Sequence, residues 1–264
     1  MNVLGLAYIF LAGLAYGIMP IWAKLAYMTG LSAYQVLFLR GFIGACFLFI
    51  FIRGKKTSLK VEKSRIGSLL FVGSVGYTAA IITLYLSYSY INVGVATALH
   101  YSFPVVVMVL ALIFYKEKLY PRKLLALILA VMGVYLMTAV GSIDLDRTGV
   151  ILALISAITF AIYVLGVAHP SIKGIDSLVL AFYLSLISAG ITFMIILGKG
   201  EWPIDLTGKG FLYVLLLGFF CTALALLFLN RGIQIVGPST ASILTTMEPV
   251  ISIVAGMIIL EEKV

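Results

Sequence analysis

The stretch VGVATALHYSFPVVVMVLALIFYKEK, residues 93–118, decides the fold, because a variant of it, PSTASILTTMEPVISIVAGMIILEEK, returns at residues 238–263. Eight of the 26 aligned positions are identical. Each copy is an apolar segment long enough to cross a bilayer, with a proline near its middle (Pro104 or Pro249) and a Glu-Lys pair at its end. A repeat built from spanning helices is the usual organisation of a secondary transporter.

The composition places the whole chain in a membrane. Hydrophobic residues make up 63% of the sequence and charged residues 11%, and the mean hydropathy is +1.18. In a soluble domain, roughly a quarter of the residues would be charged. Apolar runs of about 20 residues recur between short polar breaks, whereas a transmembrane barrel would show alternating segments of about ten residues. The chain is therefore predicted to be an all-α integral membrane protein.

The apolar runs divide into nine predicted spans: 3–26, 31–52, 66–90, 93–115, 124–141, 149–168, 177–198, 211–230 and 238–260. Residues 1–141 form the first repeat, with helices 1–5, and residues 149–264 form the second, with helices 6–9. Each repeat contains five spans, an odd number, so the second copy starts on the opposite side of the membrane from the first. The two copies must therefore be inverted with respect to one another. We predict a ten-helix bundle of two inverted five-helix repeats, and we expect the tenth helix to be absent from this chain through truncation.

Lysines and arginines set the expected orientation. With a cytoplasmic N-terminus, the inner loops hold twelve of these residues and the outer loops five. This bias follows the positive-inside rule and predicts a multi-pass protein of the inner or plasma membrane. The basic stretch Arg53–Arg65 is expected to meet anionic lipid headgroups rather than nucleic acid.

Several motifs resemble those of a known family. They are Phe160-Ala161-Ile162-Tyr163, Ser102-Phe103-Pro104-Val105 with Glu117-Lys118-Leu119, and Glu248-Pro249-Val250 with Glu262-Lys263. In these positions the chain resembles the EamA-type transporters of the drug/metabolite transporter superfamily, although the family often has Trp-Gly where this chain has Tyr16-Gly17. The resemblance implies ten helices in two inverted halves, a central cavity, and transport of small metabolites, commonly outward.

Glu248 is the first candidate for the transport site. It lies about ten residues into its span, roughly 15 Å deep, near the midplane. An ionisable group at a helix centre costs about 2.5–3.5 kcal/mol on insertion scales, so its presence needs a reason. Glu248 could bind a proton, a cation or a substrate amine. It could instead cap backbone groups freed by Pro249, and both interpretations remain open.

Arg40 and His100 lie at similar expected depths, roughly 10–15 Å from the outer surface. Arg40 could bind a substrate carboxylate or phosphate, or it could lock the bundle through an ion pair with Glu248. His100 could gate or couple transport, because histidine titrates near neutral pH. It could equally be a hydrogen-bonded packing residue.

Other candidates are tyrosines and uncharged polar residues. Tyr85 is the deepest of three tyrosines at the outer end of the third span and is predicted to line the cavity, although tyrosines there often form an interfacial belt. Asn230 is its counterpart 145 positions later, and Thr245 belongs to a set of small hydroxyl residues that either line a polar path or allow close packing. Tyr16 and Tyr163 are candidates through the family resemblance.

Other function classes find little support in the sequence. There is no P-loop, so ATP hydrolysis is not expected to drive transport. His100 and His169 are the only histidines, and no His/Cys/Asp cluster suggests a metal, a cofactor or a catalytic site. We expect a transporter rather than an enzyme, with a small-molecule substrate and membrane lipid as partners and an undetermined oligomeric state.

The predicted function is export of small polar metabolites such as amino acids, by alternating access through a cavity lined by the third, fourth, eighth and ninth spans. The alternatives are a lipid-linked flippase or drug exporter on the same fold, or a membrane sensor that does not transport. A closed cavity exposing Arg40, His100 or Glu248 would favour polar metabolites, and an apolar lateral opening would favour lipids.

Overall fold

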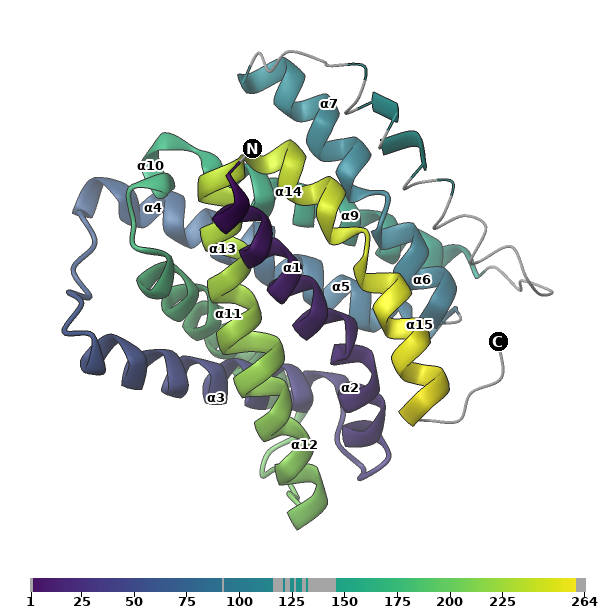
Figure 1. The fold of residues 1–264 in the computed structure, drawn as a ribbon. Coiled ribbons are helices and arrows are strands. Elements are labelled where there is room, and N and C mark those ends of the chain that lie inside the picture. The colour runs from purple at the N-terminus through teal and green to yellow at the C-terminus, as the bar shows by residue number, and fades with distance from the viewer. Residues whose placement is uncertain are drawn as a thin grey trace.

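The computed structural model describes residues 2–91, 93–115 and 146–259, together with residues 121, 124, 125, 127–129 and 132. In these regions all regular secondary structure is helical, and seven helices are long and apolar enough to span a membrane (Figure 1). Most of the predicted fifth span, 124–141, and the Glu-Lys pairs at 117–118 and 262–263 lie outside the described residues.

The first half contains the first four spans. The first span is α1 (Val3–Gly17) with α2 (Met19–Tyr27), and the second is α3 (Ala33–Gly54). The third is α4 (Lys63–Phe71), η1 (Val72–Thr78) and α5 (Ala79–Ser87), and the fourth is α6 (Val93–His100) with α7 (Phe103–Tyr115).

The second half repeats this pattern. The sixth span is α9 (Arg147–Ala168), followed by the short α10 (Pro170–Lys173), and the seventh is α11 (Ser177–Lys199). The eighth is α12 (Gly208–Gly218), η2 (Phe219–Leu224) and α13 (Ala225–Val236), which completes the seven long apolar helices. The predicted ninth span corresponds to α14 (Pro238–Thr245) and α15 (Glu248–Ile259). Figure 1 shows these last helices, α13–α15, lying against α1, in agreement with their contacts.

Local signals in the sequence set where the long helices begin and end. Ser32 and Gln35 form a reciprocal capping box at the start of α3, which satisfies two backbone N–H groups. At the start of α11, the carboxylate of Asp176 accepts hydrogen bonds from the backbone N–H groups of Leu178 and Val179. At the other end of α11, Gly200 adopts a left-handed conformation (φ +68°) that closes the helix.

The two halves run in opposite directions. Helix α3 packs along α11, and the phenylalanine rings show the sense of the pair: Phe38 lies 5.1 Å from Phe193, and Phe49 lies 6.1 Å from Phe182. Later residues of α3 thus meet earlier residues of α11, so the helices are antiparallel. Since each is the second spanning helix of its half, the repeats are inverted, as predicted.

A pair of close contacts carries the same symmetry. A Cβ added at Gly73 would lie 2.7 Å from Cδ1 of Ile187, and one added at Gly218 would lie 2.5 Å from Cγ2 of Ile43. The two glycines are 145 positions apart and the two isoleucines 144. The same close contact therefore occurs twice: in each half, a glycine without a side chain allows an isoleucine of the other half to pack directly against the helix backbone.

The third and eighth spans also share a π-helical segment, η1 in one and η2 in the other. In each, a threonine hydroxyl donates to a carbonyl five residues earlier: Thr78 to Gly73 at 2.7 Å and Thr222 to Leu217 at 3.0 Å. Such widened turns inside α-helices are frequent at functional sites.

The fourth and ninth spans are broken where the repeated prolines predict a disturbance. Pro104 lies four residues after His100, the last residue of α6, and Pro249 lies four residues after Thr245, the last residue of α14. Proline lacks an N–H for the carbonyl four residues earlier, and its ring clashes with that carbonyl. The break therefore falls just before each proline.

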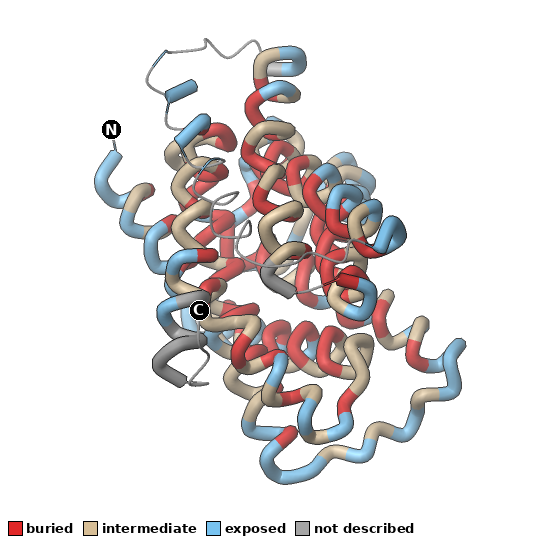
Figure 2. Tube along the Cα trace, turned by 90° about the vertical axis from the view of Figure 1, so that its right-hand side faces the viewer, coloured by how far each residue is buried: buried red, intermediate tan, exposed pale blue. Residues whose placement is uncertain are grey.

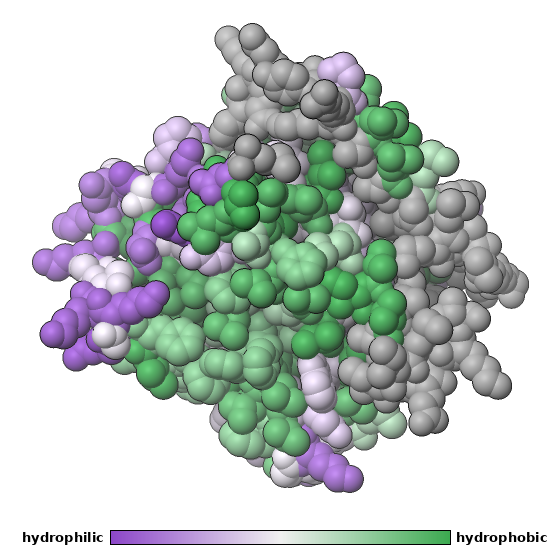
Figure 3. Space-filling model, viewed as in Figure 1, coloured by the Kyte–Doolittle hydropathy of each residue, from purple (hydrophilic) through white to green (hydrophobic). Residues whose placement is uncertain are grey.

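The outer surface fits a bilayer. Buried residues follow the inner faces of the helices, and exposed residues cover the outer faces and the long connection between α3 and α4 (Figure 2). Large apolar side chains are among the exposed ones, including Phe10, Phe42, Ile50, Ile158 and Met194. Figure 3 shows hydrophobic residues over most of the described surface in view, with hydrophilic residues gathered at its left edge, where the α3–α4 connection and α10 lie in Figure 1.

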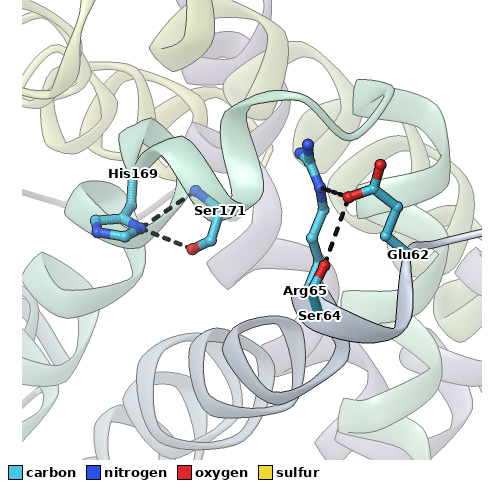
Figure 4. Close-up of polar contacts among 5 residues, drawn as sticks. All are labelled: Glu62, Ser64, Arg65, His169 and Ser171. Carbon is cyan, nitrogen blue, oxygen red and sulfur yellow. Dashed lines mark hydrogen bonds and ion pairs between the residues drawn. The ribbon is translucent and has the colours of Figure 1, made fainter.

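Short-range polar contacts stabilise the helix starts at this hydrophilic edge (Figure 4). At the start of α4, Arg65 Nε donates to Glu62 Oε2 at 2.9 Å, and this hydrogen bond and charge hold the pKa of Glu62 below its ordinary value. At the start of α10, the backbone N–H of Ser171 donates to Nδ1 of His169 at 3.3 Å. His169 is thus an exposed helix cap.

Candidate functional site

A cavity of about 60 Å³ lies between the two halves. At 10–15 Å³ for each water, it has room for roughly four water molecules. Its walls come from α1, α2, α3, η1, α5, the turn after α5, α6, the break between α6 and α7, α9 and α15. The lining residues are Tyr16, Gly17, Met19, Pro20, Arg40, Tyr77, Ala80, Ile81, Leu84, Tyr88, Thr97, His100, Tyr101, Phe160, Glu248, Pro249 and Ser252.

The structure brings together only part of the predicted site. The predicted residues in the cavity wall are Tyr16, Arg40, His100, Glu248 and Pro249. Those outside it are Tyr85, Pro104, Tyr163, Asn230 and Thr245.

The prediction for the lining spans was also partly wrong. The third, fourth and ninth spans contribute to the wall, but the eighth contributes no lining residue, and the first, second and sixth do. The reason is the packing of α13 on α1: a Cβ added at Gly232 would lie 2.2 Å from Cδ1 of Ile9. Helix α13 thus packs against α1, and α1 contributes Tyr16 and Gly17 to the cavity wall.

Arg40 is a buried cation surrounded by neutral groups, with 1% of its surface exposed. Its Nη1 donates to Tyr85 Oη at 3.1 Å and contacts Met19 Sδ at 3.0 Å, and its Nη2 donates to Tyr77 Oη at 3.3 Å. These contacts occupy three of the five guanidinium N–H groups. No carboxylate pairs with Arg40 in the described regions, so the predicted ion pair with Glu248 is not formed.

Tyr85 lies behind Arg40 rather than on the wall. Tyr85 accepts a hydrogen bond from Arg40, and its ring centroid lies 5.9 Å from the guanidinium carbon. The rings of Tyr85 and Tyr27 meet edge to face, with 6.3 Å between their centroids. Tyr85 therefore holds Arg40 in place. Among the outer tyrosines, Tyr88 is the one that reaches the cavity.

Glu248 is held by a residue that the sequence analysis did not select. Tyr101 Oη donates to Glu248 Oε2 at 2.6 Å. Tyr101 lies in the break between α6 and α7, and Glu248 begins α15 just after the break in the ninth span. This bond joins the two helix breaks. Within the described chain, no backbone N–H donates to the Glu248 carboxyl, so it does not act as a backbone cap.

His100 connects three helices. Its Nδ1 lies 2.8 Å from Ser156 Oγ on α9, and the Ser156 hydroxyl donates at 2.8 Å to the carbonyl of Ala80 on α5. The ring is surrounded by Tyr101, Phe103 and Phe160, with centroids 5.1–5.5 Å away.

The remaining candidates make contacts of their own away from the cavity. Tyr163 Oη donates to Asn230 Oδ1 at 2.6 Å, and both side chains are fully buried. Thr245 Oγ1 donates to the carbonyl of Ser242 within α14. Across the described residues, no group of three or more His, Cys, Asp and Glu side chains could hold a metal ion.

Comparison with known proteins gives a consistent result. The EamA-like transporter family matches residues 3–139 and 147–264. Solute carrier family 35 member G1 of Homo sapiens is 23% identical over 272 residues, which cover 97% of this chain and 72% of the human protein. A solved crystal structure shares the fold with a TM-score of 0.85 at 14% identity, covering 98% of this chain and 88% of that chain.

Proposed function

Because the chain belongs to the EamA-like transporter family, we propose that this membrane transporter exports small polar metabolites such as amino acids by alternating access. The proposal names a substrate class, a direction and a mechanism. Each is supported by a different feature of the cavity and its helices.

Two ionisable groups of opposite sign in the cavity support the substrate class. Arg40 and Glu248 line the same small space, and each contacts neutral groups instead of the other. Buried charged side chains are normally paired, because moving an ionised group from water into the protein interior costs free energy unless an opposite charge is close by. A substrate with a carboxylate and an ammonium group would supply both missing partners through charge-assisted hydrogen bonds. This is the observation on which the proposal depends.

The repeat supports alternating access. Inverted halves can exchange conformations, so that a site between them opens to one side and then to the other. The cavity has room for only about four waters, so a metabolite requires the helices to separate. The breaks in the fourth and ninth spans, joined by Tyr101 and Glu248, are the points at which we propose that they bend.

Glu248 supports a way of driving export. Its carboxylate can bind the substrate ammonium when the cavity is open to the cytoplasm, and it can bind a proton when the cavity is open to the opposite side. Proton entry would then return the empty carrier and drive outward transport. We propose that the N-terminus and the basic α3–α4 connection face the cytoplasm, following the positive-inside rule.

The test is transport by purified protein in liposomes containing a panel of amino acids, with and without a pH gradient. We expect counterflow of at least one amino acid, accelerated by the gradient. The variant Arg40→Gln should abolish it, because the buried cation is lost. Arg231→Gln is the matched control, since Arg231 is exposed on α13 and should keep wild-type rates.

The same assay separates the alternatives when a lipid-linked compound and an apolar cation are added to the panel. Transport of a lipid-linked or apolar cationic compound by wild type and Arg40→Gln alike would indicate a flippase or drug exporter. Binding without counterflow of any compound would indicate a sensor. Either result would overturn the proposed function.

A further inference from the structure

We propose that His100 determines substrate specificity by presenting Nε2 as a hydrogen-bond acceptor, so that the cavity favours substrates with an O–H or N–H donor in addition to their two charged groups. Ser156 is the positioning residue that fixes this arrangement. The inference rests on the proposed function, since it concerns which amino acids the cavity accepts.

The protons of the His100–Ser156 contact can be assigned by counting donors. The carbonyl of Ala80 can only accept, so the single hydroxyl proton of Ser156 points to it across the 2.8 Å bond. Ser156 Oγ has no second proton for His100 and must accept from it across 2.8 Å. The proton of a neutral His100 is therefore on Nδ1, and Nε2 carries a lone pair.

The lone pair on Nε2 has no protein donor in the described regions, although His100 is only 7% exposed and lines the cavity. The aromatic rings of Tyr101, Phe103 and Phe160 enclose the imidazole. Turning the ring over would break the bond to Ser156, so the acceptor keeps its place. Within this small cavity, Nε2 is available to accept from an O–H or N–H of the substrate, and a substrate without such a donor leaves it unpaired.

Specificity follows from this unpaired group. A site built to hydrogen-bond a substrate hydroxyl discriminates against an analogue that fills the same space without it, because the polar group of the site stays unpaired. Threonine and valine are such a pair, since they have nearly the same shape. The other ionisable groups facing this space are Arg40, Glu248 and the phenols of Tyr16, Tyr77, Tyr88 and Tyr101. In the proposed function Arg40 and Glu248 bind the charged groups shared by both amino acids.

The experiment measures kcat/KM for threonine and valine counterflow in liposomes. We expect wild type to prefer threonine at least tenfold. His100→Phe removes the acceptor but keeps an aromatic ring, and it should bring the ratio close to one while valine transport persists. Ser156→Ala removes the oxygen that holds the His100 proton on Nδ1. Either ring nitrogen can then carry the proton, so the ratio should fall severalfold. Thr159→Val is the matched control, because that hydroxyl bonds only within α9, and it should keep the wild-type ratio.

Several results would overturn the inference. One is a wild-type ratio near one with both amino acids transported, and another is a ratio that His100→Phe leaves unchanged. Thermal stabilisation of the purified protein by each amino acid provides a second measurement if His100→Phe transports poorly. Should wild type transport and bind neither amino acid while a non-amino-acid metabolite is carried, the proposed amino-acid specificity fails, and this inference fails with it.

Discussion

Replacing Tyr163 with phenylalanine removes one hydroxyl from a pair of fully buried side chains outside the cavity. That hydroxyl donates the 2.6 Å bond to Asn230 Oδ1, and the Asn230 amide nitrogen has no partner in the described regions. The substitution therefore leaves the whole amide unpaired. An unpaired buried polar group costs about 1–3 kcal/mol, whereas hydrogen bonds between membrane helices average about 0.6 kcal/mol. Because Asn230 has no second partner, we expect a loss of about 1–2 kcal/mol in the free energy of unfolding.

For a protein of this size, such a loss lowers Tm by about 2–8 °C. Thermal unfolding in detergent measures this change, and amino-acid counterflow gives KM, which should stay at the wild-type value. The double variant Tyr163→Phe/Asn230→Leu is the control: with both polar groups gone, it should be more stable than Tyr163→Phe alone. An unchanged Tm together with a raised KM would refute the reasoning, because Tyr163 would then contact substrate.

Three further predictions concern packing, coupling and pH. Gly76→Ala would place a Cβ 2.9 Å from the backbone of α9 and should cost about 1–3 kcal/mol of stability, while Gly190→Ala meets nothing within 4 Å and should be neutral by the same thermal assay. Glu248→Gln should abolish proton-driven accumulation while exchange continues with a raised KM; wild-type accumulation at every pH gradient would mean that this residue is structural. The lowered pKa of Glu62 stabilises the fold above its unfolded pKa, near 4.3, and this contribution disappears as pH falls through the folded pKa. Arg65→Gln should therefore reduce the fall in Tm on acidification by a small amount, and identical pH profiles would count against the contact.

The sequence predicted the arrangement of helices well, because apolar length and the repeat are strong signals. The motif at residues 93–118 located both helix breaks through its proline, and the inversion followed from an odd number of spans. Hydropathy cannot show which face of a helix looks inward, and the error over the eighth span has this origin. Which helix lies beside the cavity depends on the contact of Gly232 with Ile9, a long-range contact with no local signal.

The charged members of the site were predictable because an ionisable group inside a span needs a reason. Their partners were harder to predict. Tyr77 and Tyr101 are tyrosines in a chain with 15, and nothing local sets them apart from those at the membrane surface. Tyr101 did have one signal, since it lies three residues before Pro104, where a helix break is expected. Tyr85, chosen for its depth, supports Arg40 from behind instead of facing the cavity.

The duplicated contacts of Gly73 and Gly218 imply that mutational tolerance in this gene should have a period. A library of single substitutions should show intolerance in pairs about 145 codons apart wherever the two halves press against each other. The cavity residues should break that rule. Position 103, the counterpart of Glu248, holds phenylalanine, and position 184, the counterpart of Arg40 at the 144-residue offset between α3 and α11, holds leucine. Duplication thus supplied a symmetric framework, and later divergence put each ionisable group in one half only, which in the proposed function lets a substrate bind in one orientation.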